Sequence, residues 1–66
     1  MGKLKELRKQ LGMSQRELAD ASGVNFRMIQ YYEQDVKDIN RAEAATVFKL
    51  ARVLGCKMED LLDIAE

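Results

Sequence analysis

The sequence predicts an all-α fold, a compact bundle of five short helices. Three observations support this class. There is no proline and there are only four glycines, apolar residues recur at spacings of three and four, and residues that begin or end helices separate the apolar stretches. The 66 residues are expected to form a single domain over 1–66, near the lower size at which one hydrophobic core folds unaided.

The first helix is expected over residues 3–11. Leu4, Leu7 and Leu11 recur at spacings of three and four, so they lie on one side of a helix and predict its buried face. Gly12 follows directly and is expected to end the helix, because glycine takes the left-handed backbone conformation at little cost.

The second helix is expected over residues 15–22. Ser14 and Glu17 in the stretch SQRE form a capping box, in which each side chain accepts a hydrogen bond from the other residue's backbone N–H. Leu18 points inward, and Gly23 ends the helix.

The third helix is expected over residues 26–34, after a very short turn. Asn25 is a favoured residue for the position that precedes a helix. Ile29 and Tyr32 are three residues apart and are expected to share the buried side. The opposite side, facing outward, then carries Phe26, Arg27, Gln30, Tyr31 and Gln34.

Two further helices complete the predicted bundle. Asn40 and Glu43 in NRAE make a second possible capping box, which predicts a helix over residues 41–54. Its inward residues are expected to be Ala44, Val47, Leu50, Ala51 and Leu54. The last helix is expected over residues 58–64, with Leu61 and Leu62 in the core.

Composition argues against several classes of protein. With no histidine and one cysteine, Cys56, the chain offers too few ligands for a zinc site and no internal disulfide. No metal, cofactor or catalytic motif is expected, so an enzyme is not predicted. No apolar run is long enough for a bilayer span, and the N-terminus lacks the features of a signal peptide, which predicts a cytoplasmic protein without membrane contact.

Charge alone does not predict a nucleic-acid binder. Eleven basic and eleven acidic side chains give a net charge of zero. Residues 1–34 carry six basic and four acidic side chains, whereas residues 35–66 carry five and seven. The molecule could therefore present one slightly positive face.

The stretches LRKQLGMSQRELADASGVNFRMIQYYE and LARVLGCKMEDLL resemble the helix-turn-helix domains of phage repressors, Cro and related bacterial regulators. The resemblance runs from about Leu4 to Leu62. It implies a lambda repressor-like fold and sequence-specific binding of double-stranded DNA, in transcriptional regulation as a repressor. The third helix would enter the major groove while the second crosses the backbone.

The resemblance also implies roles for individual residues. The positions that look like base contacts are Asn25, Phe26, Arg27 and Tyr31. Those similar to phosphate contacts are Gln15, Gln34, Lys37 and Arg41. In similar domains an arginine of the first helix pairs with the glutamate that ends the third, which predicts a structural ion pair between Arg8 and Glu33.

Elementary chemistry supports two of these roles and leaves alternatives. The planar fork of Arg27 suits guanine O6 and N7, and Phe26 suits a thymine methyl group. The alternatives are that Arg27 is merely solvated, that Phe26 is partly core, and that Tyr31 only packs against the following loop. Asp35 departs from the family pattern, which usually has glycine there, and puts a negative charge near the expected phosphate path.

A competing hypothesis is a helix-turn-helix fold that binds protein, as an antitoxin or adaptor does. Exposed Phe26, Met28 and Tyr31 would then anchor the partner. If the chain binds DNA, a weak or DNA-induced homodimer is expected through the last helix and the turn before it, where the apolar residues are Cys56, Met58 and Ile64.

Overall fold

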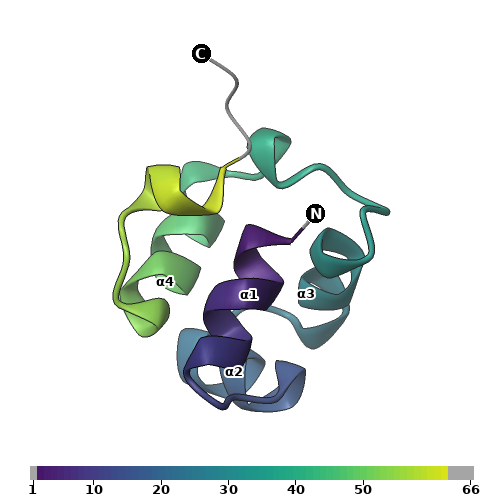
Figure 1. Ribbon diagram of the computed structural model, residues 1–66. Coiled ribbons are helices and arrows are strands. Elements are labelled where there is room, and N and C mark those ends of the chain that lie inside the picture. Colours follow the sequence, from purple (N-terminus) through teal and green to yellow (C-terminus); the bar gives the residue numbers. More distant parts are fainter. Residues whose placement is uncertain (1, 63–66) are drawn as a thin grey trace.

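The computed structural model describes residues 2–62, which form four α-helices and two short 3₁₀ helices joined by turns and loops (Figure 1). In chain order they are α1 (Lys3–Gln10), α2 (Gln15–Ser22), α3 (Phe26–Glu33), η1 (Ile39–Arg41), α4 (Ala44–Leu54) and η2 (Met58–Leu61). Residues 2–62 contain no strand, so the predicted all-α class is confirmed.

The core forms where α2 packs against both α3 and α4, and η2 closes it beside α4. One large side chain from each of these four elements is almost completely buried: Leu18, Ile29, Leu50 and Leu61. Burying each such side chain contributes about 1.5–3 kcal/mol. In Figure 1, α3 and α4 lie on opposite sides of α1, so their outward faces point in different directions.

The first helix ends one residue earlier than expected. Leu11 is 53% exposed and follows the last helical residue, so its predicted place in the buried stripe is wrong. Gly12 takes a positive φ of 68°, and the N–H of Met13 turns back to the carbonyl of Arg8. The N–H of Leu11 still bonds to the carbonyl of Leu7, so Leu11 lies at the end of the helix, but its side chain is not covered by the core.

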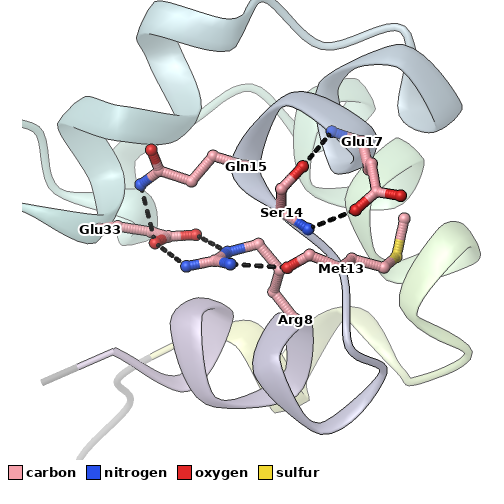
Figure 2. Close-up of polar contacts among 6 residues, drawn as sticks. All are labelled: Arg8, Met13, Ser14, Gln15, Glu17 and Glu33. Carbon is pink, nitrogen blue, oxygen red and sulfur yellow. Dashed lines mark hydrogen bonds and ion pairs between the residues drawn. The ribbon is translucent and has the colours of Figure 1, made fainter.

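Local capping fixes α2 as the sequence predicts. The Ser14 hydroxyl accepts from the Glu17 N–H at 3.0 Å, and the Glu17 carboxylate accepts from the Ser14 N–H at 2.8 Å (Figure 2). These bonds to Ser14 lower the pKa of Glu17. The bounds predicted for α2 are confirmed.

The cap and buried side of α3 also agree with the prediction. The Asn25 side chain accepts from the N–H groups of Arg27 and Met28, and Ile29 and Tyr32 are buried. At its other end the helix stops at Glu33, one residue before the predicted end.

The predicted start of the fourth helix is wrong by three residues. The chain forms η1 over Ile39–Arg41, where buried Ile39 anchors the loop and the Asp38 carboxylate accepts from the Asn40 N–H. Helix α4 therefore begins at Ala44, and Glu43 precedes it without a capping side-chain bond. The expected Asn40 and Glu43 capping box does not form, and Ala44 is exposed instead of inward.

The last predicted helix is a 3₁₀ helix over its described part. In η2 the Asp60 carboxylate accepts from the Lys57 N–H at 3.0 Å, and Leu61 is buried as expected. Leu62 is half-buried. The predicted stretch 63–64, with Ile64, lies outside the described residues.

Candidate functional site

The outward side of α3 and the residue before it carry the four predicted base contacts. Asn25 and Arg27 are exposed, and Phe26 and Tyr31 are half-buried. None of the four is enclosed in the core, although Phe26 packs against its edge. The face therefore offers a guanidinium, an amide, a phenol and part of an aromatic ring to a partner.

Asn25 has a structural task that limits what it can offer. Its Oδ1 atom accepts from the N–H of Arg27 at 2.8 Å and from that of Met28 at 3.4 Å. The Nδ2 group takes no part in this cap. As positioned, Asn25 would meet a base edge as a hydrogen-bond donor and not as an acceptor.

Arg16 joins this surface and was not among the residues predicted for it. Its guanidinium carbon lies 4.1 Å from the centroid of the Phe26 ring, within the range of a cation–π contact. The two residues belong to different helices, α2 and α3. The short turn at Gly23 brings those helices together, and this turn was the one available hint of the contact.

The predicted phosphate-contacting residues beyond α3 are exposed. Gln34 directly follows the helix, Lys37 lies in the loop, and Arg41 ends η1. The Lys37 ammonium lies 6.0 Å from the centroid of the Tyr31 ring. Lys37 and Arg41 also line one open cavity of about 340 Å³, together with Met28, Tyr32, Asp38, Ala42 and Glu43.

A buried polar cluster ties the beginning of α2 to the end of α3 (Figure 2). The guanidinium of Arg8 binds the Glu33 carboxylate through two hydrogen bonds, Nε to Oε2 at 2.7 Å and Nη2 to Oε1 at 2.9 Å. The expected ion pair is thus present, with side chains only 9% and 2% exposed. Such bidentate geometry is the strong form of a charged hydrogen bond.

Two further bonds extend the cluster to the loop and to α2. Nη1 of Arg8 donates to the carbonyl of Met13 at 2.7 Å, and Nε2 of Gln15 donates to Oε1 of Glu33 at 3.0 Å. Gln15, the predicted phosphate contact, is therefore already oriented by Glu33. Its side-chain carbonyl and second N–H are not used in that bond.

The cluster sets the charge of Glu33. Burial by itself raises the pKa of this carboxyl, but the hydrogen bonds from Arg8 and Gln15 and the nearby positive charges outweigh burial. The net pKa of Glu33 is lowered, and the hydrogen bond to Glu33 raises that of Arg8. Both groups are consequently charged near neutral pH.

The region of the predicted dimer contact is less available than expected. Cys56 and Met58 are half-buried and pack against the core. The large apolar side chains that are more than half exposed lie elsewhere in the described residues, at Leu11, Val36 and Phe48.

Within residues 2–62, no group of histidine, cysteine or acidic side chains is arranged to hold a metal ion. Over the same residues, none of the helices has the length and apolar character needed to cross a membrane.

Comparison with known protein families identifies one family that this chain matches. The model of the helix-turn-helix family HTH_3 matches residues 4–61, which is nearly the whole chain and runs from the second residue of α1 to the end of η2. None of the curated proteins matches the chain.

Proposed function

This chain belongs to the helix-turn-helix family HTH_3, a family of DNA-binding domains, and from that premise we propose that it is a repressor-like transcriptional regulator that reads a specific duplex sequence with α3. The observation that carries the proposal is the outward face of α3. It presents polar and aromatic side chains of the types that discriminate base edges, while Ile29 and Tyr32 hold the helix from beneath.

The first residues of α3 supply the base contacts in this proposal. Arg27 is exposed and suits a guanine, to which a guanidinium donates two bonds at O6 and N7. The exposed part of Phe26 suits a thymine methyl group, and Asn25 donates through Nδ2. Tyr31 lies a turn further along and reaches the edge of the groove.

Phosphate contacts on both sides of α3 would position it in the groove. Gln15 stands at the start of α2, where the first backbone N–H groups have no partner within the helix and the helix dipole favours an anion. Gln34, Lys37 and Arg41 lie beyond the other end of α3. A protein without net charge could bind a polyanion in this way, because geometry at the contacts replaces overall charge.

The protein-binding alternative draws less support from the same surface. Its anchor patch requires exposed Phe26, Met28 and Tyr31, but all three are half-buried, and Phe26 and Met28 pack against the core. Arg27 and Gln30 also stand between these three residues along α3, so polar side chains interrupt the apolar ones in the sequence.

Selection of bound sites from random duplex DNA, using the purified chain, tests the proposal directly. We expect enrichment of a motif that contains guanine and thymine in one half-site, repeated with two-fold symmetry. Recovery of unenriched DNA would contradict sequence-specific binding and favour the protein-binding alternative.

Two measurements on the selected site sharpen this test. If the protein makes about six phosphate contacts, log affinity falls against log salt with a slope of about −5. Arg27→Ala is expected to relax the base preference at one position and to cost about 1–3 kcal/mol of discrimination. The matched control is Arg52→Ala, which removes an exposed arginine from α4 and is expected to leave the preference unchanged.

A further inference from the structure

We propose that Arg16 is an additional DNA-contacting residue, which binds a backbone phosphate while stacked on Phe26, so that the two side chains act as one coupled unit. The inference rests on the proposed DNA-binding function and adds a residue that neither the family resemblance nor the sequence pattern assigned. Its basis is the stacked contact between α2 and α3.

The contact leaves the hydrogen-bonding capacity of Arg16 free. A guanidinium uses its flat face in a cation–π contact, at 4.1 Å from the ring centroid here. Its N–H donors lie in the plane of the group and point away from that axis. Within the described part of the chain, Arg16 has no carboxylate partner.

The position of the pair indicates the side on which these donors lie. Phe26 is half-buried and rests against the edge of the core, whereas Arg16 is exposed. The arginine therefore covers the solvent side of the ring. Without a carboxylate to neutralise it, the stacked guanidinium forms a positive, preorganised surface element at the junction of the two helices.

The neighbours of Arg16 favour a phosphate over a base as its ligand. Arg16 is the second residue of α2 and follows Gln15, the proposed phosphate contact. The amide of Gln15 is held by Glu33, so the first turn of α2 has a fixed place beside α3. If α2 lies along the backbone, Arg16 meets the sugar-phosphate chain next to the base that Phe26 contacts.

Stacking should couple the two contacts energetically. Arg16 limits the motion of the Phe26 ring. The ring in turn holds the arginine side chain before DNA binds, so that less conformational entropy is lost on binding. Each residue consequently contributes more to DNA affinity when the other is present.

A double-mutant cycle on the selected DNA site tests the proposal. The variants are Arg16→Ala, Phe26→Leu and the combination, each checked for folding by circular dichroism. We expect Arg16→Ala to lower affinity and to reduce the magnitude of the log–log salt slope by about 0.9, the value for one lost phosphate contact. When Arg16→Ala is made in the Phe26→Leu variant, the loss of affinity it causes should be about two- to fivefold smaller than in the wild type.

Two controls separate the possible explanations. Arg16→Lys keeps the charge but not the planar fork, so it should retain the salt slope while losing part of the affinity. Arg52→Ala also removes one arginine charge, but from α4, which lies on the other side of α1 from α3 in Figure 1. It should change neither the DNA affinity nor the salt slope.

An unchanged salt slope in Arg16→Ala would overturn the proposal, and so would losses that simply multiply in the double variant. In either case the proposed function stands if the wild type and Arg52→Ala still bind the selected site. Absence of any DNA binding by the wild type would overturn both. If Phe26→Leu does not fold, Phe26→Met takes its place, and the slope of Arg16→Ala still decides the phosphate contact.

Discussion

At the scale of single residues, Arg8 has the most consequential environment in the molecule. It donates to Glu33, the last residue of α3, and to the Met13 carbonyl in the loop before α2, so one side chain bonds to both ends of the helix-turn-helix. The charges are nearly inaccessible to water. Removing one partner therefore leaves a buried charge without compensation.

We expect Arg8→Met to lower the free energy of unfolding by about 3–5 kcal/mol, because Glu33 loses its charge partner. That is comparable to the whole stability of a core of this size, so about half of the protein should be unfolded at 25 °C when the two figures are equal. Urea denaturation followed by circular dichroism measures the effect.

Matched variants identify the cause of this loss. Lys9→Met changes an exposed basic residue of the same helix and should cost little. The double variant Arg8→Met/Glu33→Leu removes both charges and should recover part of the stability lost in the single variant. An Arg8→Met protein with the wild-type midpoint would show that the pair has no structural role.

The lowered pKa of Glu33 predicts a dependence of stability on pH. Its folded-state pKa lies below the unfolded value of about 4.3, so the unfolded state binds the proton more readily. The contribution of Glu33 is then fully present above pH 4.3 and is lost as the pH falls through the folded-state pKa. Unfolding free energies between pH 7 and pH 3 should fall more steeply for the wild type than for Glu33→Gln. Parallel curves would contradict this.

At the scale of elements, the end of α3 depends on an unusual residue. Asp35 has a positive φ of 59°, and the next N–H, of Val36, returns to the Tyr31 carbonyl at 2.8 Å. The N–H of Asp35 itself bonds to the carbonyl of Tyr32. This is the Schellman arrangement, in which glycine is usual and aspartate is tolerated.

Substitution of Asp35 by glycine and by alanine isolates this conformational effect. Both variants lose the contacts of the aspartate side chain, but only alanine adds a Cβ that is unfavourable at positive φ. We expect Asp35→Gly to be more stable than Asp35→Ala by about 1 kcal/mol. Equal unfolding midpoints would show that the turn relaxes without cost.

The elements also show what a sequence can and cannot predict. Ser14 and Asn25 fix the starts of α2 and α3 because their capping bonds join residues two or three apart, which the sequence displays directly. The start of α4 was missed because a local capping pattern at Asn40 competed with the burial of Ile39, and burial depends on the rest of the fold.

The same reasoning applies to the candidate site. The outward direction of Arg27 follows from helical periodicity, and the Arg8 and Glu33 pair was expected from family resemblance. No fixed separation along the sequence predicts the contact between Arg16 and Phe26, because it depends on how closely two helices cross.

At the scale of the whole molecule, the apolar surface bears on assembly. Cys56 and Met58 are half-buried and pack against the core. Among the described residues, only part of each of these side chains is therefore left for the predicted dimer contact. A stable interface usually buries about 800 Å² on each partner, and a smaller one gives weak association.

We therefore expect a monomer at micromolar concentration and assembly of two copies on symmetric DNA. Half-sites about 34 Å apart, one helical turn, should bind two molecules cooperatively, and a single half-site should bind one. Sedimentation of the free protein and titration of both duplexes measure this. Insertion of five base pairs between half-sites should abolish cooperativity by placing the copies on opposite faces of the duplex. A dimer that persists without DNA would contradict the expectation.

The shared bonding of Gln15 and Arg8 to one Glu33 carboxylate has a final consequence for the nucleic acid. Because these bonds hold the beginning of α2 to the end of α3, the proposed phosphate contact at Gln15 and the proposed base contacts on α3 can shift little relative to each other. In the proposed complex the DNA duplex would then have to adapt its own groove width and bending to the protein. Base pairs that the protein does not contact would influence affinity through their stiffness. The preferred operator would then depend on the deformability of the DNA as well as on the hydrogen bonds that its base edges offer.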